Sequence, residues 1–480
     1  MNDRIDRHVW RIASVVILGS IMSILDTTIV NIALETLGRE LHSTLADIQW
    51  VITGYMLALA AVIPVTGWAA RRFGPRRLYL LSHVLFSAGS ALCGFAGSTT
   101  QLIVFRVVQG IGGGMLLPVG QMMMARAAGP TRMGRVMGVV AVPAMLAPIL
   151  GPTIGGLILD NASWRWIFFV NLPVGVLAFA AALKILPRGE REDAGRLDVR
   201  GLALMASGLP LLTYGLAEIG ATGSFTATRA VVPFFSGLAL IGVFVRHALR
   251  ARRPLLDLRL YRRATFASAS ITMFCLGAAL FGGMILMPLY WQQIRGESVV
   301  ATGLLTAPMG LGMALVMPLV GRLTDRFGGG LLALAGVIVT TIATIAFGLI
   351  GAHTSISWLS IAMFVRGMGV GFAFMPAMAA AFASLQPSEI PDATPQLNVL
   401  QRIGGSIGTA VLAVVLERAL AGTTSLDAAA AAYGTAFWWS LGITALAIVP
   451  CVVLLRAERA ARERPRDATL TELVPAPEAA

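Results

Sequence analysis

Long apolar runs, separated by short polar stretches, repeat along almost the whole chain. Fourteen of them are about 20 residues or longer, the length that a helix needs to cross a bilayer. These runs cover residues 12–34, 49–70, 78–97, 100–125, 135–159, 166–186, 200–219, 230–249, 265–291, 299–320, 331–352, 357–384, 395–418 and 433–455. The pattern predicts an all-α polytopic membrane protein with 14 transmembrane helices. An even number of spans places both termini on one side of the membrane.

Basic residues lie mainly on that same side. Of the 37 Lys and Arg residues, 29 lie in segments on the N-terminal side, 5 in the opposite loops and 3 within spans. Because positive loops stay cytoplasmic, both termini are expected in the cytoplasm of a multi-pass protein. The dominance of Arg over Lys favours a GC-rich bacterial genome and hence the bacterial cytoplasmic (inner) membrane. The net charge of +13 is too scattered for a nucleic-acid surface.

Two similar stretches reveal an internal repeat. Gly67–Gly74 follows the second span and Gly321–Gly328 follows the tenth, and spans 4 and 12 each carry an early arginine, Arg106 and Arg366. Repeated halves with a site between them are typical of secondary transporters. The repeat predicts a cytoplasmic tail (1–11), an N-terminal six-helix half (12–186), an inner loop with an inserted helix pair and a basic segment (187–264), a C-terminal six-helix half (265–455) and a disordered cytoplasmic tail (456–480).

The basic segment 246–263 interleaves leucines with arginines. It is expected either to lie flat on the inner leaflet, held there by its arginines, or to form an ordinary basic loop.

Leu25–Asn31 carries the most unusual chemistry of the chain. Asp26 is the only acidic residue that falls deep within a predicted span. A carboxylate there is costly and usually functional, which favours a proton-coupled process. The alternative is a structural aspartate bonded to Thr27, Thr28 or the neighbouring backbone.

Arg106 is expected to lie at a depth similar to that of Asp26, because the two spans run in opposite directions at about 1.5 Å per residue. The arginine favours the ionised carboxylate and burial favours the neutral acid, a balance that suits a proton switch. For Arg106 the alternative is a structural tie to backbone carbonyls.

Other chemistry is largely excluded by the residues present. The three cysteines fall in apolar spans and match neither a disulfide framework nor metal spacing. The chain has no phosphate-binding loop of the G-x-x-x-x-G-K-[ST] type. We therefore expect no cofactor, no metal and no enzymatic activity.

Several motifs, in order and at the expected spans, together resemble the major facilitator superfamily. Leu25–Leu34 is similar to the first-helix motif of its drug:proton antiporters with fourteen spanners, the EmrB/QacA-like multidrug efflux transporters. The other motifs are Arg106–Gly112, Gly151–Gly156, Ser163–Phe169 with Asn171–Pro173, and Gly321–Gly328. The chain departs from the family at Arg71, where an Asp is usual, and at Glu35, where a Pro is frequent.

The resemblance implies the major facilitator fold and roles for several groups of residues. Asp26 and Arg106 would couple protons. The antiporter motif in span 5 would seal the halves against leak, or would simply pack small residues. That motif is Gly151, Pro152, Gly155 and Gly156; the candidate cavity residues are Asn31, Trp50, Tyr55, Gln121, Tyr290, Gln292, Asn398 and Gln401; the inner gate loops hold Gly67, Arg71, Arg72, Gly74, Gly321, Asp325, Arg326 and Gly328.

The inner gate is expected to rest more on Asp325 than on Arg71, with Arg126, Arg132 or Arg135 as partners for Asp325. Arg71 would instead meet a helix C-terminus or an acid such as Glu389 or Asp392. The alternative is that Arg71 is a harmless substitution on a solvated loop.

The expected function is proton-coupled antiport that exports hydrophobic, often cationic drugs by alternating access. The partners would be small lipophilic substrates, protons and the lipid bilayer, and the protein would act as a monomer. Two alternatives remain open from the sequence: a dedicated exporter or flippase of one endogenous lipid or secondary metabolite, and a non-transporting membrane sensor.

Overall fold

The computed structural model describes residues 6–129, 136, 151, 154–187, 192–223 and 226–463, and within these ranges it contains helices and turns but no strand. Twelve helices of the described part are long and apolar enough to cross a membrane. Helix α4, of 20 residues, is not among these twelve and covers most of the predicted span 78–97. Most of the predicted span 135–159 lies outside the described residues, and its helix is described again from 154. The predicted 14-helix class is confirmed.

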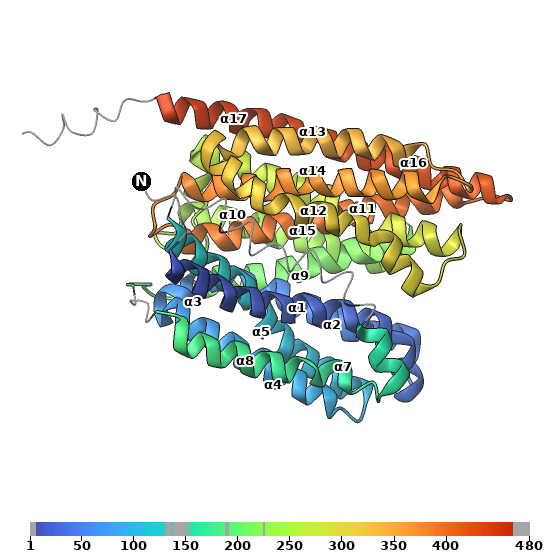
Figure 1. Cartoon of the computed structure of the whole chain (residues 1–480). Helices are drawn as coiled ribbons and strands as arrows, with labels where there is room; N and C mark the ends of the chain where they lie inside the picture. The colour runs from blue at the N-terminus through green and yellow to red at the C-terminus, as the bar shows by residue number, and fades with distance from the viewer. Residues whose placement is uncertain are drawn as a thin grey trace, which may run out of the picture.

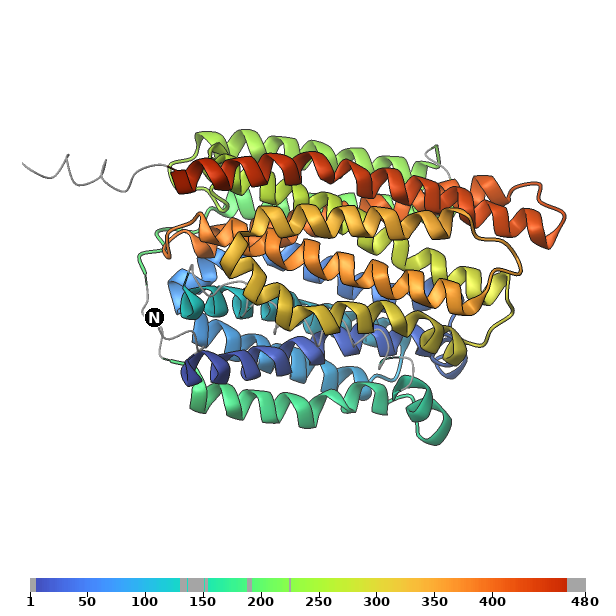
Figure 2. The same ribbon diagram turned by 45° about the horizontal axis from the view of Figure 1, so that its top comes forward.

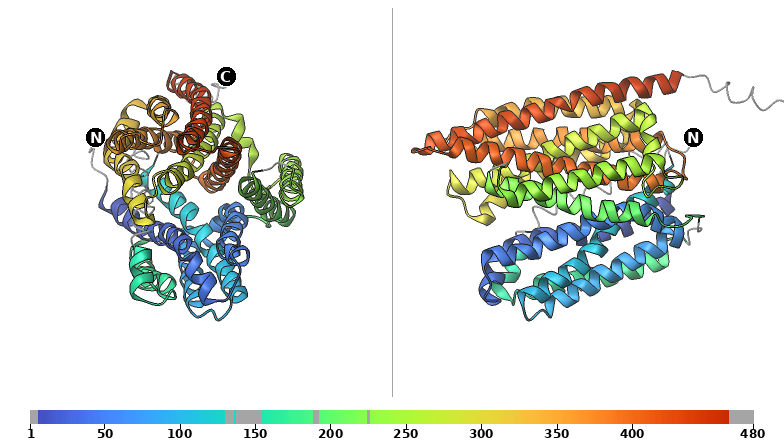
Figure 3. Two further views of the ribbon diagram at one scale, coloured as in Figure 1. Left: turned by 90° about the vertical axis from the view of Figure 1, so that its right-hand side faces the viewer. Right: turned by 180° about the vertical axis from the view of Figure 1, so that it is seen from behind.

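The N-terminal half lies below the C-terminal half in Figure 1, and the inserted pair stands at the edge of the bundle in Figure 3. The N-terminal half comprises α1 (Arg7–Glu40), α2 (Leu45–Val62), the 3₁₀-helix η1 (Ile63–Val65), α3 (Thr66–Phe73), α4 (Pro75–Gly94), α5 (Thr99–Ala128), α7 (Trp166–Phe169) and α8 (Asn171–Ile185). The inserted pair is α9 (Val199–Thr222) and α10 (Thr228–Arg250), followed by the 3₁₀-helix η2 (Leu258–Arg262). The C-terminal half comprises α11 (Ala264–Gln293), α12 (Val299–Phe327), α13 (Gly329–Gly348), α14 (Ile356–Ala383), α15 (Ile390–Leu420), α16 (Leu426–Leu446) and α17 (Ile448–Glu463).

Helix α1 begins and α17 ends at the same end of the bundle, which we call the inner end (Figures 1 and 2). One buried hydrophobic cluster joins the inner parts of both halves and includes Met124 of α5 and Leu397 of α15. The outer parts have separate clusters, one with Trp164 in the N-terminal half and one with Trp291 in the C-terminal half. In the described part of the chain, the halves therefore pack together at their inner ends.

The two repeated loops turn in the same way. Gly74 ends α3 with φ 84°, and Gly328 ends α12 with φ 96°. Side chains other than glycine rarely adopt this left-handed region, which explains why both copies of the loop carry glycine there. The common backbone turn supports the relation between the halves that the sequence repeat indicates.

The basic segment does not present its leucines to the membrane. Leu255, Leu256 and Leu260 are only 3%, 3% and 6% exposed and belong to the inner hydrophobic cluster. The backbone N–H of Leu255 also donates to Asp198, at 3.1 Å. The burial of these leucines in a protein core favours the ordinary basic loop, while a segment held flat on the inner leaflet by its arginines stays a prediction.

The predicted disordered tail also needs a correction. Helix α17 continues past Leu455 to Glu463, and residues 464–480 lie outside the described residues. The Glu458 carboxylate accepts hydrogen bonds from the backbone N–H groups of Gly329 and Gly330, at 3.2 and 2.7 Å. A carboxylate at the start of α13 satisfies otherwise unpaired donors, so this tertiary contact favours continuation of the helix.

Candidate functional site

Asp26 and Arg106 form a fully buried ion pair inside the N-terminal half. Both residues are 0% exposed, and Arg106 Nη1 lies 2.6 Å from Asp26 Oδ2. The contact expected from their depths in α1 and α5 is therefore present. Charged side chains inside a membrane span are usually paired with each other or with backbone carbonyls.

Two amides complete the environment of the carboxylate. Gln109 Nε2 and Asn171 Nδ2 each donate to Asp26 Oδ1, at 2.8 Å. Asn171 is the first residue of α8, where a short break separates α7 from α8. Its amide also donates to Ser90 Oγ at 3.1 Å, and Ser90 in turn donates to the Phe168 carbonyl at 2.9 Å. Helices α1, α4, α5, α7 and α8 thus meet at one hydrogen-bonded centre.

Arg106 has partners besides the carboxylate. Its Nε donates to the carbonyl of Val51 at 3.2 Å, and Nη1 donates to Gln109 Oε1 at 2.8 Å. Its guanidinium carbon lies 4.1 Å from the centroid of the Tyr55 ring. The arginine therefore keeps two acceptors and an aromatic face when Asp26 is neutral, which limits the cost of protonating the acid.

The described part of the antiporter motif packs against α1 next to Asp26. A methyl group on Gly151 would collide with the Thr28 side chain, and one on Gly155 would meet Ile29. Gly156 has open space in this direction, and Pro152 lies outside the described residues. Gly151 and Gly155 lie four residues apart and therefore share one helix face, and this face approaches α1.

Contacts between the halves gather at the inner end. Arg71 Nη1 lies 2.7 Å from Asp392 Oδ1, so Arg71 of the first loop meets one of the two acids expected for it. A methyl group on Gly67 would collide with the carbonyl oxygen of Pro391. Close approach of α3 to the start of α15 therefore requires a small residue at this position.

Two predicted cavity residues hydrogen-bond across the same interface. Asn398 Nδ2 donates to Gln121 Oε1 at 2.8 Å, and both side chains are buried. This bond links α5 to α15, one helix from each half. The two residues therefore hold the halves together in this conformation.

The contacts expected for the second gate loop are only partly described. Arg126 pairs with Glu192 at 2.7 Å, while Arg132 and Arg135 lie outside the described residues. Asp325 has an interaction partner.

Glu389 pairs with Arg263 through both carboxylate oxygens, at 2.7 Å each. Burial opposes ionisation of Glu389, but these bonds and the Gln386 N–H lower its pKa below the usual value.

The other predicted cavity residues do not form one cluster. Tyr55 belongs to the buried ion-pair site, with its hydroxyl 3.4 Å from Ser23 Oγ. Trp50 is 41% exposed and stacks on Tyr214 of the inserted pair, with ring centroids 5.6 Å apart. Tyr290 is buried in the outer cluster of the C-terminal half and donates to the carbonyl of Gly351 at 2.7 Å. Asn31 and Gln292 are exposed and Gln401 is half-buried.

Gln109, Asn171 and Ser90 were not predicted as site residues. Gln109 and Asn171 lie within the quoted motifs, and each is an amide in or next to an apolar span. That polarity is a usable signal, because a polar group in lipid needs a partner. Ser90 gives no such signal, since a lone serine is easily satisfied by its own helix.

The chain belongs to the Major Facilitator Superfamily, which matches residues 16–409. It is 42% identical over 417 residues to the "Multidrug resistance protein B homolog" of Mycobacterium tuberculosis (strain ATCC 25618 / H37Rv), covering 86% of this chain and 77% of the relative. It is 31% identical over 402 residues to the "Multidrug export protein EmrB" of Escherichia coli (strain K12), covering 82% and 77%.

The fold also resembles that of the human organic anion transporter MFSD10, with a TM-score of 0.67 and 16% identity. That similarity covers 92% of this chain and 99% of the other. At this identity the likeness establishes the fold alone.

Proposed function

We propose that this protein exports hydrophobic, often cationic drugs from the cytoplasm in exchange for protons. Relatives over more than four-fifths of the chain are named as multidrug resistance and multidrug export proteins. An antiporter needs no nucleotide, because the membrane potential supplies about 2.3 kcal/mol per charge per 100 mV. The protein is then not an enzyme but an efflux carrier that can contribute to antibiotic resistance.

The buried pair of Asp26 and Arg106 is the observation that carries the proposal. Arg106 cannot release its proton, so Asp26 is the group of the pair that titrates. A proton on Asp26 removes the charge that holds Arg106 Nη1 at 2.6 Å. Because the pair joins α1 to α5, protonation changes how strongly these two helices are held together.

The donors around Asp26 support a role in proton coupling rather than in drug binding. Three side chains, those of Arg106, Gln109 and Asn171, donate to its two oxygens, and the residue is 0% exposed. A cationic substrate therefore has no access to this carboxylate in the present conformation. Coupling would instead act through the packing of α1 against span 5, where Gly151 approaches Thr28.

The inter-half contacts fit an outward-facing state of an alternating-access cycle. Arg71–Asp392 and Gln121–Asn398 close the inner end, and the outer hydrophobic clusters are separate. To load drug from the cytoplasm, the protein would have to break both contacts. We place the protein in the bacterial cytoplasmic membrane as a monomer, with both termini in the cytoplasm, as the charge bias favours.

The test is uptake of a fluorescent cationic dye into inside-out vesicles that carry the full-length protein and a proton gradient. We expect Asp26→Asn to lose gradient-driven uptake, while Asp26→Glu, which keeps a titratable carboxyl, retains part of it. Both variants are compared at matched amounts of membrane-inserted protein. Full uphill transport by Asp26→Asn, still dependent on the proton gradient, would contradict the proposal.

A further inference from the structure

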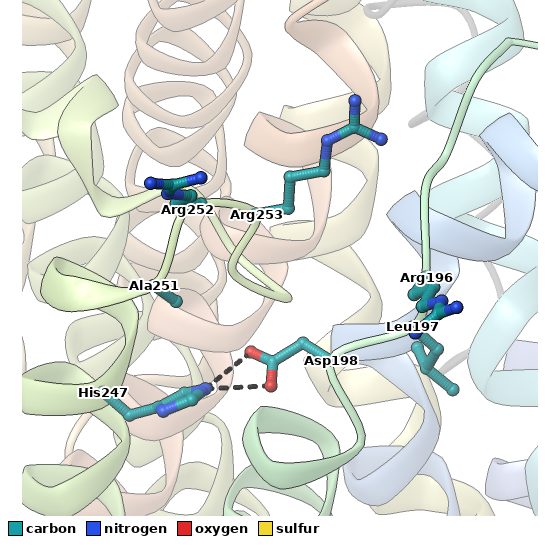
Figure 4. Close-up of a pocket in the computed structure, with 7 residues that line it drawn as sticks. All are labelled: Arg196, Leu197, Asp198, His247, Ala251, Arg252 and Arg253. Carbon is teal, nitrogen blue, oxygen red and sulfur yellow. Dashed lines mark hydrogen bonds and ion pairs between the residues drawn. The ribbon is translucent and has the colours of Figure 1, made fainter.

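A pocket of about 490 Å³ opens at the inner end of the inserted helix pair (Figure 4). One wall is the inner loop that leads into α9, and the other is the turn that follows α10. Seven residues line the pocket: Arg196, Leu197, Asp198, His247, Ala251, Arg252 and Arg253. Three of them are arginines, and the only lining acid is Asp198, so the pocket is basic.

Asp198 is already engaged by the protein. It caps the N-terminus of α9 by accepting from the Gly201 N–H at 2.9 Å, and it also accepts from His247 Nε2 at 2.8 Å and from the Leu255 N–H. Partial burial works against ionisation, but these hydrogen bonds lower the pKa of Asp198 below its usual value. The carboxylate therefore stays ionised and occupied at neutral pH, and it holds the two walls together.

The arginines leave an excess of positive charge. Arg253 donates to the exposed carboxylate of Asp193 at 3.1 Å. Arg196 and Arg252 are exposed, and neither is paired with an acid in the part of the chain that the structure describes. They stand on opposite sides of the pocket in Figure 4. Two arginines that line one pocket from opposite sides suit a ligand that bears phosphate oxygens.

The surface beside the pocket is apolar and faces outward from the bundle. Helix α10 stands at the edge of the bundle (Figure 3, left). Phe235, Leu238, Val245 and Leu249 are 60%, 49%, 39% and 58% exposed. Their spacing along the helix puts them on one stripe, which ends beside the turn that carries Ala251. In a bilayer this stripe contacts acyl chains, and the pocket then lies at the level of the lipid headgroups.

We propose that this pocket binds the phosphate headgroup of an anionic phospholipid of the inner leaflet. Arg196 and Arg252 bind the phosphate, and the acyl chains lie along the apolar stripe of α10. Basic pockets beside transmembrane helices on the cytoplasmic side are suited to such headgroups.

Occupation of the pocket also bears on the inner gate. The loop wall is bonded to α3, through Trp68 Nε1 to the Gly195 carbonyl at 3.4 Å and through the Glu192 N–H to the Arg71 carbonyl at 3.1 Å. The segment after the other wall is bonded to α15, through Gln396 Nε2 to the Asp257 carbonyl at 3.1 Å. A headgroup that bridges the two walls therefore favours the closed inner end.

The test is native mass spectrometry of the delipidated full-length protein, titrated with phosphatidylglycerol or with phosphatidylcholine. We expect the parent to bind phosphatidylglycerol roughly tenfold more tightly, and the double variant Arg196→Gln/Arg252→Gln to lose that preference. The matched control is Arg11→Gln/Arg77→Gln, which removes the same charge from exposed inner positions outside the pocket. This control is expected to keep the preference within about twofold.

Two results would overturn the proposal. Equal loss of the preference in the pocket variant and the control would mean that only the overall surface charge attracts lipid. Displacement of phosphatidylglycerol by inorganic phosphate at physiological concentration would mean that the pocket takes a free anion rather than a lipid. The readout is binding, so it does not depend on whether the protein exports drugs.

Discussion

The buried ion pair predicts an unequal response to the removal of its two charges. Asp26→Asn leaves Arg106 charged and 0% exposed, next to an amide that has only one oxygen. That oxygen can keep the bonds from Gln109 and Asn171, which both reach Asp26 Oδ1. The new NH₂ group then faces Arg106 Nη1, a donor against a donor, where the carboxylate oxygen now lies at 2.6 Å.

The magnitude follows from what each variant leaves behind. Removing one partner of a buried pair costs about 3–5 kcal/mol, and Asp26→Asn should cost this much because Arg106 cannot be neutralised. Arg106→Gln should cost less, since Asp26 can take up a proton and keeps two amide donors. The double variant Asp26→Asn/Arg106→Gln removes both charges, so its cost should fall below the sum by about 3 kcal/mol.

The assay is unfolding of the purified protein in mixed micelles of dodecyl maltoside and sodium dodecyl sulfate, followed by tryptophan fluorescence. The four proteins of the cycle are compared for free energy of unfolding at pH 7.5.

Additive costs would refute the reasoning. If the double variant equals the sum of the single variants within about 0.5 kcal/mol, Asp26 and Arg106 are not energetically coupled. An Arg106→Gln cost larger than that of Asp26→Asn would also contradict the argument, because it would make the carboxylate the group that cannot be neutralised.

Three further predictions concern the site, the gate and the topology. Asn171→Leu should lose a bond to a charged group, worth about 1.5–3 kcal/mol, and reduce dye transport, whereas Asn171→Gln should retain more; equal transport by both would contradict this. Arg71→Ala should weaken the closed inner end by about 1 kcal/mol, roughly a fivefold change in the equilibrium between its closed and open states. The charge exchange Arg71→Asp/Asp392→Arg should transport more dye than Arg71→Asp alone or Asp392→Arg alone. Arg252→Cys should react with a membrane-impermeant maleimide only in inside-out vesicles, and Ser298→Cys only in intact cells. The reverse pattern would mean that the topology is the opposite of the one proposed.

The sequence by itself determined the membrane class and most of the spans, and its charge bias predicts their sidedness. A helix in lipid satisfies its backbone hydrogen bonds within its own segment, so each span is a local property that hydropathy reveals. Helix α5, for example, ends at Ala128, close to the end of the predicted span at residue 125. The pairing of Asp26 with Arg106 was also predictable, because rise per residue fixes depth and lipid forces a buried charge to find a partner.

Only the tertiary structure decided which faces and loops meet. Gln109 and Asn171 reach Asp26 because α5 and α8 turn those faces toward α1, and residue spacing does not encode the rotation of one helix against another. Leu255 lies in the inner hydrophobic cluster, and its backbone N–H donates to Asp198, a residue 57 positions earlier in the chain. Arg71 pairs with Asp392 while Glu389 goes to Arg263, a choice that depends on competing partners brought together from both halves. Such long-range contacts follow from packing of the whole bundle, which no single segment specifies.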